Sequence, residues 1–70
     1  MLTMDYRMID ILNADQLEVD DLIGLGDDVV KIISITSMKN GFSAIVENDF
    51  NEREEIEIGD DERFELFIWS

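Results

Sequence analysis

Residues 29–47, VVKIISITSMKNGFSAIVE, contain the pattern that decides the fold class. Two runs rich in β-branched residues, 29–36 and 42–47, lie on either side of Lys39-Asn40-Gly41, and β-branched residues favour strands. An Asn-Gly pair between two such runs is a strong signal for a β-hairpin, because both residues tolerate positive φ. The sequence therefore predicts a long hairpin in the middle of the chain.

Shorter runs on both sides of this hairpin also read as strands. Further strands are expected at residues 2–12, 22–25, 54–58 and 64–69, with turns at 26–28 and 59–63 and one capped helical turn at 13–17. Five or six short strands at this spacing predict an all-β fold, and the economical form at 70 residues is a curved, partly open barrel. We expect residues 1–70 to form a single domain, because this length leaves no room for a second core.

The order of these elements resembles that of small SH3-like barrels. The similar segment runs from Leu17 to Leu66 and contains a Leu in a turn, an acidic pair, a short strand, a Gly-Asp turn and a long Val/Ile strand. KOW-type domains, such as the first domain of elongation factor P, and short acidic barrel proteins of bacteriophages share this order. The resemblance implies the fold alone, since Val19-Asp20-Asp21 stands where the families usually carry Gly-Asp and the RNA-binding basic residues of KOW domains are absent.

The composition excludes several functions. The chain has 18 Asp and Glu against 5 Lys and Arg, a formal net charge of -13, and no Cys or His. Disulfides, thiolate nucleophiles, His-based acid–base pairs and ordinary zinc sites are therefore excluded. No apolar run is long enough to cross a bilayer, and the first residues lack the features of a signal peptide. We expect a cytoplasmic protein.

Neither catalysis nor a dedicated metal site is expected, and no cofactor is implied. Pairs such as Asp20-Asp21 are adjacent in sequence, and adjacent residues of a strand point to opposite faces. A barrel of this size is filled by its own side chains and leaves little room for a substrate. A calcium loop that began at Asp49 would need an acid or amide at Arg53 and a glycine at Glu54.

The C-terminal third carries the densest negative charge. Between Glu47 and Glu65 there are ten acidic and two basic residues. If the apolar residues of the last two strands face inward, the carboxylates between them face outward on adjacent strands and form one patch. A register slip of one residue would reverse these faces. The expected acidic binding face consists of Glu55, Glu57, Asp60, Asp61, Glu62 and Glu65.

The first and last strands carry apolar residues at both parities. Tyr6 and Met8 share one parity, whereas Ile9 and Ile11 share the other. In the last strand, residues 64, 66 and 68 can fill the core and leave residues 67 and 69 on the opposite face. If the two strands pair, the outward residues form a contiguous patch of the kind that marks interfaces, unless one terminus folds over it. The expected apolar interface consists of Tyr6, Met8, Phe67 and Trp69.

These features favour a non-catalytic protein-binding module over an enzyme. The expected partner is a basic protein, because strong negative charge repels nucleic acid and anionic membranes. In its sharpest form the protein is a small phage or bacterial accessory factor that inhibits a host protein by occupying its nucleic-acid groove. The alternative is a structural or oligomerising component of a virion or assembly, in which the apolar interface makes self-contacts, as in a homodimer, and the acids serve solubility.

Overall fold

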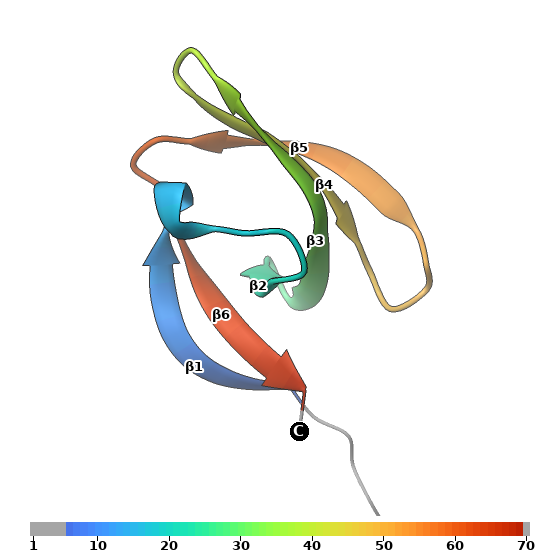
Figure 1. Ribbon diagram of the computed structural model, residues 1–70. Coiled ribbons are helices and arrows are strands. Elements are labelled where there is room, and N and C mark those ends of the chain that lie inside the picture. Colours follow the sequence, from blue (N-terminus) through green and yellow to red (C-terminus); the bar gives the residue numbers. More distant parts are fainter. Residues whose placement is uncertain (1–5, 70) are drawn as a thin grey trace, which may run out of the picture.

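The computed structural model describes residues 6–69, without the side chain of Trp69, and these residues form one antiparallel sheet (Figure 1). Its elements are β1 (Tyr6–Asn13), the 3-10 helix η1 (Ala14–Gln16), β2 (Leu22–Leu25), β3 (Asp28–Met38), β4 (Gly41–Glu47), β5 (Arg53–Gly59) and β6 (Arg63–Trp69). The strand order is β1-β6-β2-β3-β4-β5, and the sheet does not close between β1 and β5. The prediction of an all-β, partly open fold with one helical turn is confirmed.

The strands lie close to their predicted positions. β2 coincides with the expected strand, and β5 and β6 begin or end within one residue of theirs. The part of the expected first strand before Tyr6 lies outside the described residues. The helical turn is η1, where the N–H of Asn13 donates a 2.9 Å hydrogen bond to Gln16 Oε1, as in a capping box.

The central hairpin is confirmed as β3 and β4, but Gly41 has a different role from the one expected. The loop consists of Lys39 and Asn40, neither of which has a positive φ, and Met38 pairs directly with Gly41. Gly41 has a φ of 152° and begins β4, where an added Cβ would collide with the carbonyl oxygen of Ile58 in β5. The glycine is therefore required by the close approach of two strands.

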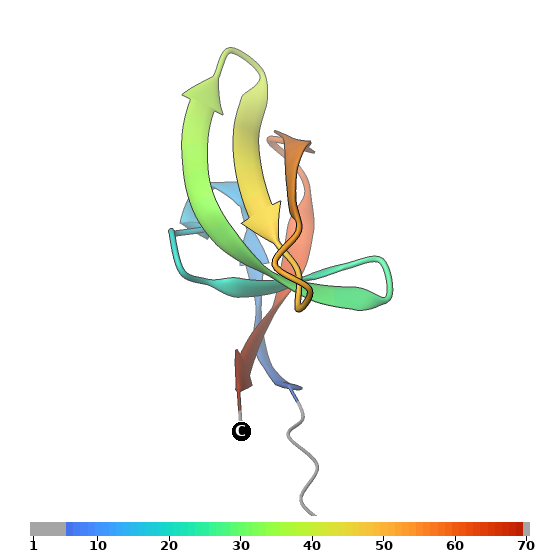
Figure 2. The same ribbon diagram turned by 90° about the vertical axis from the view of Figure 1, so that its right-hand side faces the viewer.

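A second hairpin joins β2 to β3. Its loop is Gly26-Asp27, between the paired residues Leu25 and Asp28. Gly26 has a φ of 63°, and the first loop position of a type II′ turn favours glycine for this reason. Figure 2 shows the turns of the two hairpins at opposite ends of the long strand β3.

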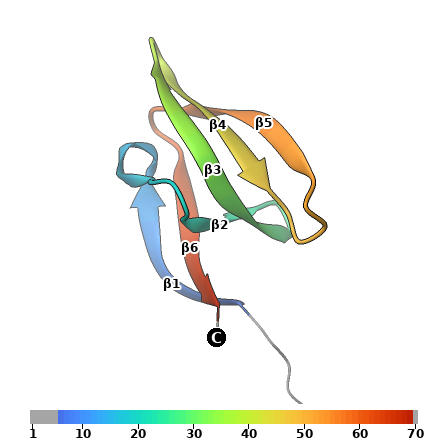
Figure 3. The same ribbon diagram turned by 45° about the vertical axis from the view of Figure 1, so that its right-hand side comes forward.

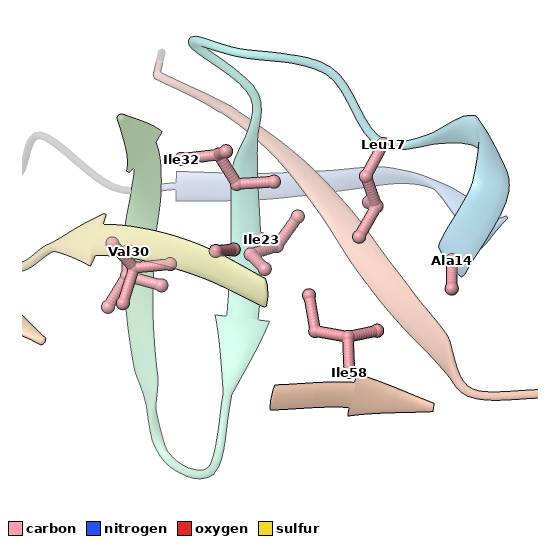
Figure 4. Packing of buried hydrophobic residues seen from close by; sticks show 8 residues of the cluster. Ala14, Leu17, Ile23, Val30, Ile32 and Ile58 are labelled. Atoms are coloured by element: carbon pink, nitrogen blue, oxygen red, sulfur yellow. The ribbon is translucent and has the colours of Figure 1, made fainter. Parts of the chain in front are cut away.

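The core lies inside the curve of the sheet. Ile23 and Ile32 are completely buried, and Figure 4 shows Leu17, which follows η1, directed toward Ile23 and Ile58. Burial of such side chains is the main stabilising contribution in a chain without disulfides. The buried apolar residues are Ala14, Leu17, Ile23, Val30, Ile32, Ala44, Val46 and Ile58.

Candidate functional site: an acidic groove and an apolar strip

Two glutamates of β5 lie on the outer face of the sheet. Glu55 and Glu57 are exposed, whereas Ile56 is half-buried and Ile58 is buried. Glu57 lies opposite Ser43 of β4, and the hydroxyl of Ser43 donates a 3.1 Å hydrogen bond to Glu55 Oε2. The two carboxylates therefore share one face, as the alternation predicted.

The turn between β5 and β6 is held in shape by Glu62. The N–H of Gly59 donates a 2.7 Å hydrogen bond to Glu62 Oε2, and the N–H of Glu62 donates to the Gly59 carbonyl over 3.2 Å. The Glu62 carbonyl in turn accepts a 3.0 Å bond from the N–H of Ala14. These bonds tie the turn to η1 and leave Asp60 and Asp61 exposed in it.

A shallow, open depression of about 940 Å³ lies between this turn and the tip of the β3–β4 hairpin. The directly paired Gly41 and Gly59 leave it without side chains at the end of the β4–β5 ladder. Met38, which is 57% exposed, gives it apolar surface. We call this depression the acidic groove, and its charged lining residues are Lys39, Glu55, Glu57, Asp61 and Glu62.

The structure brings four of the six predicted acidic residues together in this groove. Asp60 lies in the same turn but does not line the depression. Glu65 lies apart, beside Gly24 of β2. The expectation that β5 and β6 are adjacent was wrong, because β5 pairs with β4 and β6 pairs with β1 and β2. Alternation within each strand could predict the exposed side chains, but it carries no information about which strands are neighbours.

The first and last strands pair and place the predicted apolar residues side by side. Met8 lies directly opposite Phe67, and Tyr6 lies opposite Trp69. Met8 is 47% exposed. Phe67 is half-buried and covers Gly24, where an added Cβ would lie 3.1 Å from the aromatic ring. For Trp69 only the backbone pairing is described, and its side chain lies outside the described part of the structure.

A bulge in β1 changes the side chains that this face carries. The register shifts between Met8 and Asp10, so Ile9 has no partner in β6. Because of the extra residue, Ile11 lies on the same face as Met8, opposite Glu65, and is 55% exposed. The expectation that Met8 and Ile11 lie on opposite faces was wrong, since simple alternation does not allow for a bulge. We call Tyr6, Met8, Ile11 and Phe67 the apolar strip.

Tyr6 also has a polar partner. Its hydroxyl donates a 2.6 Å hydrogen bond to Asp49 Oδ1 in the loop between β4 and β5. This bond raises the pKa of Tyr6 above its ordinary value of 10, and burial and the negative charge of Asp49 act in the same direction. Tyr6 therefore connects β1 to the segment just before β5, at the two margins of the open sheet.

The same loop presents an aromatic side chain that sequence analysis missed. Phe50 is 82% exposed. Asn48 Oδ1 accepts hydrogen bonds from the N–H groups of Phe50 and Glu52, over 2.8 and 3.0 Å, and Asn48 Nδ2 donates to Glu52 Oε1 over 3.0 Å. The available signal was a lone aromatic residue in the polar segment NDFNE.

The described residues show no metal centre: between residues 6 and 69 no group of three or more Asp or Glu side chains is arranged to hold an ion. No helix in the same range has the length and apolar character needed to span a membrane. Comparison of the chain with protein-family models, with curated proteins and with solved structures found no match.

Proposed function

We propose that this chain is a non-catalytic protein-binding module whose acidic groove receives a basic segment of another protein. The observation that carries the proposal is the placement of four carboxylates around one open depression, in which Lys39 is the one cation among the described residues. Met38, which is 57% exposed, adds apolar surface to the same depression, on which the methylene stems of Lys or Arg can pack. The net charge of -13 supplies long-range attraction for a positively charged partner.

In its sharpest form, the proposal makes the partner a protein that binds nucleic acid. Duplex DNA presents about one negative charge per 1.7 Å of its axis. A chain with a net charge of -13 in 70 residues offers the same sign of charge at high density. It would occupy the basic groove of such a protein, and duplex DNA added in excess would displace it.

The test measures the binding of a Lys- and Arg-rich peptide at about 50 and about 500 mM salt, over which the screening length falls roughly threefold. The double substitution Glu57→Gln with Asp61→Asn removes two charges from the groove. Its matched control, Asp27→Asn with Asp28→Asn, removes the same charge from the β2–β3 turn, outside the groove. We expect the groove variant to bind roughly fivefold more weakly at low salt and the control to change little. Equal losses in the two variants would show that only total charge matters.

The apolar strip supports a second candidate, an oligomerising component of an assembly. Met8 and Ile11 are 47% and 55% exposed on the face that also carries Phe67, and exposed apolar patches mark interfaces. Sedimentation at micromolar concentration tests this candidate with Ile11→Ser. Val19→Ser is the control, since Val19 is 50% exposed and lies outside the strip. An oligomer that only Ile11→Ser dissociates would favour this candidate, and a monomer would exclude it.

A further inference from the structure

β5 is an edge strand and forms one margin of the open sheet. Among the described strands it pairs with β4 alone, and Figure 3 shows β4 on one side of it and no strand on the other. The β4–β5 pairing runs from Glu47–Arg53 to Gly41–Gly59 without a register shift. Along its outer margin β5 is therefore a regular strand, which is the form that can accept a further strand.

The hydrogen bonds at the two ends of β5 show which of its backbone groups point outward. At one end the N–H of Asn48 donates to the carbonyl of Glu52, so this pair is hydrogen-bonded across the hairpin. In an antiparallel ladder hydrogen-bonded and non-hydrogen-bonded pairs alternate. Counting from this pair, Glu55 and Glu57 are in non-hydrogen-bonded pairs, so their N–H and C=O groups point away from β4.

The other end of β5 gives the same phase independently. The N–H and C=O of Gly59 bond to Glu62 rather than to Gly41. Gly59 and Gly41 are therefore a non-hydrogen-bonded pair of the ladder. Because the two kinds of pair alternate, the pairs of Glu57 and Glu55 are of the same kind. Between residues 6 and 69, no backbone hydrogen bond outside the β4 ladder involves Glu55 or Glu57. Their amide and carbonyl groups are free for another strand.

The exposed carboxylates select the chemistry of that strand. In an added strand, the residues opposite Glu55 and Glu57 would be two apart and would lie on the same face as the two carboxylates. Lys or Arg at these positions would meet opposite charge. A second copy of β5 would instead place glutamates close to glutamates, which is destabilising.

The opposite margin of the sheet is less open. β1 contains the bulge at Ile9, and Asp10 Oδ1 accepts a 2.7 Å hydrogen bond from the N–H of Ile11. Bulges and charged residues are devices that protect sheet margins from pairing. This contrast assigns strand addition to β5.

We propose that β5 binds a basic, extended segment of another protein by antiparallel strand addition, with cations at two positions, i and i+2, opposite Glu55 and Glu57. This inference rests on the proposed function and specifies how the basic partner is held. The backbone groups of the two glutamates supply the affinity that does not depend on sequence, and their carboxylates supply the preference for Lys or Arg. Glu55 and Glu57 also line the acidic groove, so the same two carboxylates take part in both sites.

The test uses an eight-residue peptide in which Lys and Thr alternate. One version is N-methylated at the Lys residues and a second at the Thr residues, so both keep their charge and lose the same number of backbone N–H groups. In an antiparallel added strand, the Lys residues opposite Glu55 and Glu57 direct their N–H groups at β5 and lie on the same face as the two carboxylates. Methylation at Lys is therefore expected to weaken binding at least tenfold and methylation at Thr about twofold or less. On binding the unmodified peptide, the amide protons of Glu55 and Glu57 should become protected from hydrogen exchange.

A pair of protein variants gives a second readout. Glu55→Gln and Glu55→Pro remove the same charge, but only Pro also removes the outward N–H, and proline is tolerated at such positions of a marginal strand. We expect Glu55→Pro to bind roughly fivefold more weakly than Glu55→Gln. If Glu55→Pro does not fold, amide exchange in the unaltered chain decides the question.

The outcomes separate the two claims. Strand addition is overturned if binding depends on salt but the two methylation patterns weaken it equally and the amides of Glu55 and Glu57 gain no protection. That result would leave the proposed function standing. No binding of the unmodified peptide at low salt would overturn both.

Discussion

The hydroxyl of Tyr6 lies 2.6 Å from Asp49 Oδ1, although the two residues are 43 positions apart in the chain. Tyr6 begins β1 at one margin of the sheet, and Asp49 lies in the loop that leads into β5 at the other. The N–H of Ala14, by contrast, donates to the carbonyl of Glu62 and only extends the β1–β6 ladder beyond Asn13 and Arg63. The Tyr6–Asp49 hydrogen bond therefore joins the two margins that no ladder closes.

The first prediction concerns alkaline pH. The raised pKa of Tyr6 means that the folded protein favours the neutral phenol, which alone can donate to Asp49. The stabilisation that this hydrogen bond gives the folded state is fully present below the pKa of Tyr6 in the unfolded chain, near 10. It is lost as pH rises through the higher pKa of Tyr6 in the folded protein. Tyr6 is the only tyrosine, so the ultraviolet absorbance of ionised phenol reports its pKa directly.

The Tyr6→Phe variant is the control for this effect. Since the bonded groups are partly exposed, we expect it to lose about 0.5–1 kcal/mol at pH 8. Its difference from the unaltered chain should shrink above pH 10. A difference that stays constant up to pH 11.5 would contradict a role for the Tyr6 proton.

The second prediction concerns the two glycines with positive φ. Gly41→Ala would place a Cβ against the Ile58 carbonyl, so we expect a loss of about 2 kcal/mol or more. Gly26→Ala is the matched control, because its φ is 63° and no atom of the described residues lies within 4 Å of the added Cβ. It should cost only about 1 kcal/mol. Chemical denaturation measures both, and equal losses would contradict the steric argument.

The third prediction concerns the protected margin of β1. Asp10→Ala removes the acceptor for the N–H of Ile11 and opens that margin, so self-association should rise with protein concentration. Asp10→Asn keeps a side-chain oxygen and loses the charge. Light scattering separates the two causes, since association in both variants would point to charge rather than to the hydrogen bond.

The fourth prediction concerns the exposed aromatic residue of the β4–β5 loop. Phe50→Ala should leave the free energy of unfolding within about 0.5 kcal/mol, because the side chain is 82% exposed. Asn48→Ala removes three hydrogen bonds that shape the loop and should cost about 1 kcal/mol. Thermal unfolding compares the two variants. A large loss for Phe50→Ala would mean that Phe50 packs against something other than solvent.

Local patterns predicted the elements of this fold well. The β-branched runs around residues 39–41 were sufficient for β3 and β4, because strand preference and turn chemistry act between near neighbours. The role of Gly41 was not predictable in the same way, since it depends on the carbonyl of Ile58 in another strand. The hairpin was therefore predicted correctly, although the argument placed Asn40 and Gly41 in the turn and the loop consists of Lys39 and Asn40.

The candidate site depended more on long-range arrangement. Alternation predicted that Glu55 and Glu57 share an exposed face, but the separation of Glu65 from them follows from strand order. The position of Ile11 required knowledge of the bulge, and the partner of Tyr6 required the whole curve of the sheet. These features depend on packing between distant segments, which no window of sequence contains.

The unpaired residue in β1 gives this strand an unusual tolerance of changes in length. Deletion of the codon for Ile9 would join Met8 to Asp10 and yield an unbroken ladder, with the other side chains kept on their present faces. A deletion in β5 just before Glu55 would turn Glu55 and Glu57 inward and Ile56 outward. Descendants of this gene can therefore lose a residue in the first strand without losing its surface, whereas the fifth strand must keep its length.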